Sequence, residues 1–146
     1  MFKHILIPTD GSELSDKAVA SGLKLSKQMS ATVSALHVTK PFHLIAIDSA
    51  ALTDTREQYE RHATAAARKI IQECQQSARS EGVPFDGSYV SSDHPYEAII
   101  KAARDKACDL ILMASHGRSG MQGVLLGSET QKVLTHSRIP VLVYRS

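Results

Sequence analysis

The feature that most restricts the fold of this chain is a run of five consecutive apolar residues, LILMA, at positions 110–114. A strand with one face in water alternates apolar and polar side chains, whereas a strand covered on both faces is apolar throughout. The run is short and ends in small residues before a glycine-rich bend, which favours a strand at Asp109–Ala114. It predicts a parallel sheet with helices on both of its faces.

The first forty residues predict a strand, a helix and a second strand. His4–Pro8 is short and apolar, and a cluster of turn and helix-cap residues, TDGS, follows it. Thr32–Val38 supplies the second strand. Between the two strands, apolar residues recur at spacings of three and four, as on one face of a helix: Leu14, Ala18, Gly22, Leu25 and Met29. This order is a βαβ unit, whose two strands are parallel.

The middle of the chain carries a connection and a long helix. Thr39–Asp54 has no clear period and contains Pro41, so we expect a mobile connection there. Thr55–Arg79 is rich in helix-forming residues, and Gly82 suits the left-handed conformation that ends a helix. The predicted inward face of this helix comprises Tyr59, Ala66, Ile70 and Cys74.

The remaining segments complete an alternating pattern. They are a strand at Phe85–Ser91, a helix from Pro95 to Ala107, the strand at Asp109–Ala114, a helix at Ser128–His136 and a strand at Ile139–Tyr144. Five strands alternating with four helices predict one α/β domain over residues 1–146, with a doubly wound, mainly parallel sheet and helices on both faces.

Composition excludes several classes of function. The formal charge of +2 comes from interspersed acidic and basic residues, so we expect no nucleic-acid partner. No apolar run approaches the roughly 20 residues that span a bilayer, and no signal peptide precedes the first strand, so we expect a cytoplasmic protein without membrane insertion. Cys74 and Cys108 lie far apart and are expected to be reduced and structural.

Two distant loops are expected to converge. In doubly wound sheets the ligand crevice lies beyond the carboxyl ends of the strands, where the strand order reverses. The loops Pro8–Ser12 and Ala114–Ser128 follow the first and fourth strands and therefore share that edge.

The second of these loops has the composition of a phosphate-binding segment. Its glycines, Gly117, Gly120 and Gly123, lack a Cβ. Their backbone can therefore take positive φ, and their N–H groups can approach an anion closely. Gly127-Ser128 then places the free N–H groups of a helix start where a phosphate would lie.

Side chains of the same loop can add to that site. The hydroxyls of Ser128 and Thr130 can donate to phosphate, and Arg118 and His116 can supply charge or hydrogen bonds. The simpler interpretation is that Ser128 caps the helix, with Gln131 completing a capping box.

Asp10 is the candidate in the first loop. It directly follows a strand and can accept hydrogen bonds from ribose hydroxyls or help to hold Mg²⁺; alternatively it only initiates the turn at Gly11. The Walker pattern and the G-x-G-x-x-G pattern are both absent, and no nucleophile stands beside an evident base. We therefore expect no catalytic residues, and at most slow hydrolysis of a bound nucleotide.

The chain resembles the universal stress protein family along almost its whole length. The resemblance rests on the opening ILIPTDGS, on a second strand that ends in LHV, and on the block ILMASHGRSGMQGVLLGSETQKVLTHSRIPVLVYR. The nucleotide-binding branch of that family has the pattern glycine, two residues, glycine, nine residues, then glycine and serine or threonine. Gly117, Gly127 and Ser128 match its later positions, whereas Ala114 stands where the first glycine is expected.

The resemblance implies a strand order of 3-2-1-4-5 and ATP, with or without Mg²⁺, between the two loops. The residues that it places at the nucleotide are Pro8, Thr9, Asp10, Val38, Met113, Ala114, His116, Gly117, Arg118, Gly120, Gly127, Ser128, Glu129 and Thr130. It also implies a homodimer through the last strand, by way of Val141, Leu142, Val143 and Tyr144.

The leading hypothesis is a regulatory, stress-response homodimer whose bound ATP biases the Thr39–Asp54 segment or the dimer surface, so that a partner protein reads its state. A second hypothesis is a weak Mg²⁺-dependent ATPase or phosphotransferase assisted by Asp10 and His116. A third is a structural homodimer that no longer binds nucleotide.

Overall fold

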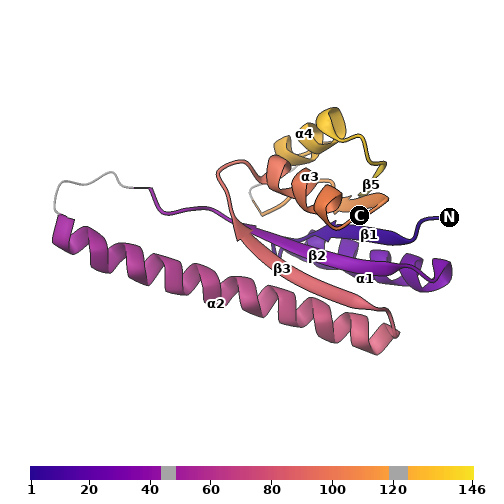
Figure 1. The fold of residues 1–146 in the computed structure, drawn as a ribbon, viewed down its shortest axis with the longest axis horizontal. Coiled ribbons are helices and arrows are strands. Elements are labelled where there is room, and N and C mark those ends of the chain that lie inside the picture. Colours follow the sequence, from indigo (N-terminus) through magenta and orange to yellow (C-terminus); the bar gives the residue numbers. More distant parts are fainter. Residues whose placement is uncertain (44–48, 119–124) are drawn as a thin grey trace.

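Five parallel strands form one sheet in the order β3-β2-β1-β4-β5 (Figure 1). The computed structural model describes residues 1–43, 49–118 and 125–146, and for residues 49–54 it describes the backbone alone. The elements are β1 (His4–Pro8), α1 (Glu13–Met29), β2 (Thr32–Thr39), α2 (Ser49–Glu81), β3 (Phe85–Ser91), α3 (Pro95–Asp105), β4 (Leu110–Ala114), α4 (Ser128–His136) and β5 (Val141–Tyr144). The predicted α/β class and strand order are confirmed, and the sheet is parallel throughout.

Helices cover both faces of the sheet, as the apolar run predicted. On β4, Leu110 and Leu112 pack into the core cluster on the α1–α2 side. Ile111 and Met113 alternate with them and pack on the α3–α4 side. All five residues of β4 are buried, because neither face of this central strand meets water.

The connection after β2 is shorter than predicted. Thr39 belongs to β2, and α2 begins at Ser49 rather than at Thr55, so the prediction of an irregular Thr39–Asp54 is wrong at both ends. The polar residues before Thr55 resemble a helix start, but Ala50, Ala51 and Leu52 are strong helix formers and the helix includes them. The predicted mobility also covers residues 44–48, and for them it stays a prediction, because they lie outside the described residues.

The predicted inward face of α2 is correct in part. Cys74 is buried and Ile70 is half-buried as predicted, whereas Ala66 and Tyr59 are exposed, and Ala67 and Ala78 are buried in addition. Tyr59 belongs to the N-terminal half of α2, which extends beyond the sheet in Figure 1, and its ring lies 5.4 Å from that of Phe42 rather than in the core. Of the described helices, none is long and apolar enough to cross a membrane.

Candidate functional site

A cavity of about 540 Å³ lies at the carboxyl edge of the sheet. The ends of β1, β2 and β4 and the first residues of α3 and α4 line it. Twelve of the fourteen residues predicted for the site line this cavity: Pro8, Thr9, Asp10, Val38, Met113, Ala114, His116, Gly117, Gly127, Ser128, Glu129 and Thr130. Arg118 bonds to the first loop beside it, and Gly120 lies outside the described residues.

One wall of the cavity is apolar. Leu36, Ile99 and Met113 line it and belong to the core cluster on the α3–α4 side of the sheet, and Val38 packs against that cluster. Leu36 and Ile99 are almost completely buried, so this wall is rigid and pre-formed. Its chemistry suits a flat, weakly polar ring.

Asp10 joins the two loops that were expected to converge. Its Oδ1 accepts a hydrogen bond from Ser12 N at 2.9 Å, and its Oδ2 accepts one from Arg118 N at 2.8 Å. The Arg118 guanidinium in turn donates to Gly11 O at 3.2 Å. The bond to Ser12 is the turn-forming bond of the simpler interpretation, but the bond to Arg118 crosses between loops, so Asp10 does more than initiate a turn.

The Asp10 carboxyl is ionised at neutral pH. Burial raises the pKa of Asp10, but hydrogen bonds donated by Ser12, Ser15 and the Arg118 amide outweigh it and hold the pKa below its ordinary value. With both oxygens already accepting backbone hydrogen bonds, the carboxylate can still accept a further one from a ligand hydroxyl, because each oxygen has two lone pairs.

Gly117 is required by a close approach and not by its dihedral angles. Among described glycines, only Gly11 and Gly82 have positive φ, so the prediction of positive φ at Gly117 is wrong, whereas the close approach of its N–H group to an anion stays a prediction. A Cβ at Gly117 would lie 2.3 Å from Asp10 Oδ2. The missing side chain is what lets Asp10 reach the Arg118 amide. Gly120 and Gly123 lie outside the described residues.

The start of α4 is open toward the cavity. Gly127 is its N-cap residue and makes no side-chain cap, and Gln131 Nε2 donates to Leu126 O at 3.0 Å, so the predicted capping box of Ser128 and Gln131 is wrong. The first intrahelical hydrogen bond runs from Gln131 N to Gly127 O at 3.0 Å. The three preceding amides, at residues 128–130, therefore have no helical carbonyl to bond and can serve an anion.

Two predicted ligand groups are already engaged elsewhere. The Thr130 hydroxyl is buried and donates to Ala114 O at 3.0 Å, so it ties α4 to β4. The Glu129 carboxylate accepts from Tyr96 N at 2.9 Å and from Lys132 Nζ at 3.3 Å. Glu129 thereby caps the start of α3, where the N-cap residue His94 makes no side-chain cap.

Ala114 stands where the family pattern has its first glycine, and it is one of the residues that line the cavity. It lies in β4 and is absent from the described residues with positive φ, so alanine introduces no backbone strain there. Its methyl group packs with Leu110 and Leu112 in the core on the α1–α2 side. Its neighbour Met113 packs on the α3–α4 side, and both residues line the cavity.

Sequence reasoning missed six residues that line the cavity: Ser15, Leu36, Lys40, Asp93, Pro95 and Ile99. Lys40 and Asp93 lie just beyond the ends of β2 and β3, so the rule that all carboxyl ends of a parallel sheet share one edge could have found them. Asp93 Oδ1 also lies 2.5 Å from His43 Nε2, which joins the two segments.

The structure gives Asp10 no companion metal ligands. Within residues 1–43, 49–118 and 125–146, with the side chains of 49–54 set aside, no group of three or more His, Cys, Asp or Glu side chains could hold a metal ion. Magnesium at this site would depend on the phosphates of a ligand for most of its oxygen partners.

The predicted dimer residues lie at an open edge of the sheet. β5 pairs only with β4, so its other side carries no strand of this chain in the described structure. Leu142 is 41% exposed there, and Val141, Val143 and Tyr144 are half-buried.

The sequence profile of the universal stress protein family matches residues 1–145. This chain belongs to the universal stress protein family. Universal stress protein YxiE of Bacillus subtilis is 29% identical over 149 residues, which cover 99% of this chain and all of the relative. The solved structure of a universal stress protein from Methanocaldococcus jannaschii is 28% identical, with a TM-score of 0.84, and the match covers 100% of this chain and 97% of that one.

Two solved universal stress proteins contain nucleotides. One is in complex with cAMP, is 24% identical and has a TM-score of 0.73, with coverage of 99% of this chain and 97% of that chain. The other, from Archaeoglobus fulgidus, is in complex with dAMP, is 13% identical and has a TM-score of 0.71, with coverage of 99% and 98%. At these identities the two structures share the fold of this chain, and members of the family bind nucleotides.

Proposed function

We propose that this universal stress protein binds ATP in the cavity at the carboxyl edge of the sheet and acts as a regulatory homodimer. One observation carries the proposal. Three helices begin at the cavity: Ser12 caps α1 and Glu129 caps α3, but α4 has no side-chain cap within the described residues. An anion would satisfy the free amides of α4 and interact favourably with its dipole.

The cavity offers complementary surfaces for the three parts of a nucleotide. The adenine ring lies on the apolar wall near Val38 and Met113, and the ribose hydroxyls donate to Asp10. The phosphates lie at the open start of α4, from Gly127 to Thr130, with Gly117 allowing close approach and Arg118 and His116 beside them. The volume of about 540 Å³ is of the size that small-molecule ligands occupy. The cAMP and dAMP complexes of the two relatives support a nucleotide as the ligand.

The same cavity supports binding more than turnover. The Asp10 carboxylate accepts hydrogen bonds from two backbone amides and its pKa is lowered, so it is a weak base. The protein then signals through its bound state. Mg²⁺ accompanies the phosphates rather than a dedicated protein site.

The segment Lys40–His43 connects the cavity to α2 and is suited to report its occupancy. Lys40 lines the cavity, and its carbonyl accepts a hydrogen bond from Tyr59 OH of α2 at 2.8 Å. The rings of Phe42 and Tyr59 lie 5.4 Å apart, and His43 pairs with Asp93. A ligand that contacts Lys40 or Asp93 therefore affects the exposed surface of Lys40–His43 and α2, to which the partner protein binds.

Calorimetric titration with ATP and Mg²⁺ tests the binding site. Gly127→Arg is expected to abolish binding, because its side chain occupies the anion position and crowds His116, whose Cα lies 3.2 Å from a Cβ at position 127. Ser80→Arg adds the same charge at an exposed position on α2 and should bind like the wild type. Binding by Gly127→Arg, or none by the wild type, would overturn the proposal; in the latter case the structural homodimer gains support.

Phosphate release from ATP separates regulation from hydrolysis. We expect the rate of the wild-type protein with Mg²⁺ to match that of Gly127→Arg. A wild-type rate clearly above the variant's would favour the weak ATPase.

Sedimentation equilibrium tests the proposed dimer through β5. Leu142→Arg places a charge on this edge and should yield a monomer at concentrations where the wild type is dimeric. Val90→Arg is the matched control, because Val90 is 39% exposed on β3, the opposite edge strand. Equal assembly of both variants would contradict the β5 interface.

A further inference from the structure

The helix α2 is much longer than the sheet that it covers. Its 33 residues span about 50 Å at 1.5 Å per residue, whereas β2, with eight residues, spans only about 26 Å. Figure 1 shows the N-terminal half of α2 extending past the sheet. Along the described side chains of α2, burial begins at Ala67, and residues 55–66 are exposed or half-exposed.

Within the described side chains, Tyr59 joins this projecting half to the body of the protein. Its hydroxyl donates to Lys40 O, and its ring contacts that of Phe42. A helical stretch of this length without tertiary packing is only marginally stable in water. A surface that covers it would stabilise both the helix and the segment after β2.

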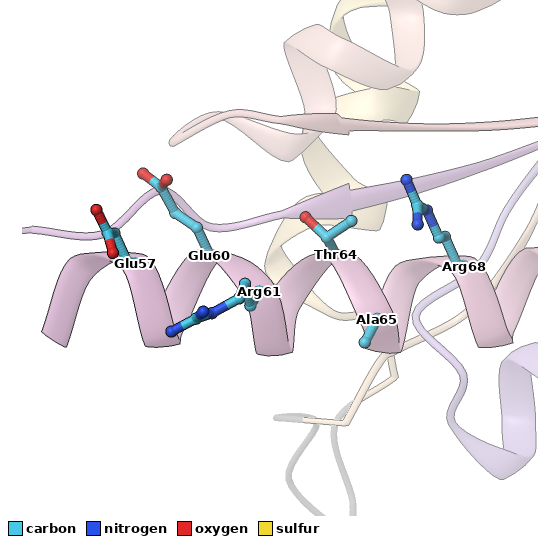
Figure 2. A pocket seen from close by; sticks show the side chains of 6 residues that line it. All are labelled: Glu57, Glu60, Arg61, Thr64, Ala65 and Arg68. Carbon is cyan, nitrogen blue, oxygen red and sulfur yellow. The ribbon is translucent and has the colours of Figure 1, made fainter. Parts of the chain in front are cut away.

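One face of the projecting half carries a shallow hollow of about 420 Å³, which we name the α2 face. Its residues recur at helical spacing and are labelled in Figure 2: Glu57, Glu60, Arg61, Thr64, Ala65 and Arg68. The small side chains of Thr64 and Ala65 form the hollow between longer charged ones. Acidic residues come first along the face and Arg68 comes last.

From this arrangement we infer that the α2 face binds the α2 face of a second copy of the chain, with the two helices antiparallel. When the α2 faces of two copies pack antiparallel, Glu57 of each copy lies opposite Arg68 of the other. Arg61 and Thr64 then lie at matching levels along the two helices, and so do Glu60 and Ala65. The charges of the two glutamates and two arginines sum to zero, so the α2 face does not attract a partner of one charge sign. The order of its charges makes it complementary to a second α2 face in the antiparallel direction.

The side chains of the α2 face are available for this contact. Glu57 and Arg61 form no ion pair with any other described side chain. Glu60 has a long intrahelical pair with Arg56 at 3.8 Å, and Arg68 donates only through Nε, to Tyr89 OH at 3.3 Å. No described residue accepts a hydrogen bond from the terminal nitrogens of Arg68, so they can pair with a carboxylate. The contact depends neither on nucleotide nor on the β5 edge.

Charge reversal tests this pairing by sedimentation equilibrium over protein concentrations up to about 1 mM, the range of weak association. Wild-type protein is expected to show an association step that weakens as salt is added. Glu57→Arg and Arg68→Glu should each weaken this step by about tenfold, because each turns two symmetric attractions into repulsions. An equimolar mixture of the two variants should restore it, since both opposing pairs are again of opposite charge.

Two control variants test whether the association step uses the α2 face. Arg79→Glu reverses a charge on α2 outside the face and should leave the association step unchanged. Leu142→Arg, directed at the β5 edge, should also retain the step, which separates this interface from that one. No association of the wild type, or a mixture that fails to restore it, would overturn the inference. Either result would leave the nucleotide proposal unaffected.

Discussion

Gly117→Ala is the single substitution that most directly disrupts the contact between the two loops of the site. The new Cβ would lie 2.3 Å from Asp10 Oδ2, so the carboxylate must move and lose its hydrogen bonds from Arg118 N and Ser12 N. Hydrogen bonds to a charged group contribute about 1.5 kcal/mol each at the low end, which suits this partly exposed pair. Alanine offsets about 0.7 kcal/mol of this loss, because it restricts the unfolded chain more than glycine does. The free energy of unfolding should therefore fall by about 2 kcal/mol.

Urea unfolding in a double-mutant cycle isolates the cause. In an Asp10→Ala background the carboxylate is gone, so Gly117→Ala should be neutral or stabilise by roughly 0.5 kcal/mol. Far-UV circular dichroism can follow unfolding in all four proteins, because none of the changes lies in a helix or strand. A loss of similar size in both backgrounds would show that the contact with Asp10 is not the reason for glycine at this position.

Three other predictions follow from the same structure. Burial raises the pKa of Cys74 and of Cys108 to about 11, so at pH 8 both thiols should react with an aromatic disulfide roughly a hundredfold more slowly in the native than in the urea-unfolded protein; equal rates would contradict their burial. Glu129→Ala should lower the free energy of unfolding by about 1 kcal/mol and speed exchange of the Tyr96 amide, because α3 loses its cap; unchanged exchange would count against the cap. The pKa of Asp10 lies below its ordinary 3.8, so its stabilisation is complete above pH 3.8 and is lost as the pH falls through the lowered value. The stability difference between wild type and Asp10→Asn should therefore shrink in that acid range, and a constant difference from pH 7 to the acid limit would refute the assignment.

The order of strands and helices could be predicted because apolar periodicity and turn residues mark it directly. β1, β3 and α4 have the predicted bounds, and the resemblance supplied the strand order. The start of α2 could not be placed, since Thr53-Asp54-Thr55 resembles a helix cap and only the preceding Ala50-Ala51-Leu52 favours continuation. Local sequence held both signals, and no rule of local propensity decides between them.

The site could be located but its internal bonding could not. Gly117 was expected to allow positive φ and a close approach to an anion. It has no positive φ, and its close contact with Asp10 joins residues far apart in sequence. Glu129 lines the cavity as expected, and its side chain also caps α3, a role that depends on how two helices pack. Such roles arise from tertiary distances, which hydrophobic patterns do not encode.

The three small positions of the glycine pattern differ in what a larger side chain meets there. Gly117 and Gly127 face crowded loop atoms, so a methyl group at either position would require neighbours to move. Ala114 already carries a methyl group in β4, where it belongs to the core cluster with Leu110 and Leu112 and lines the cavity as well. In this chain the first position therefore accommodates alanine with the cavity present. A search pattern that requires glycine at all three positions would miss this protein.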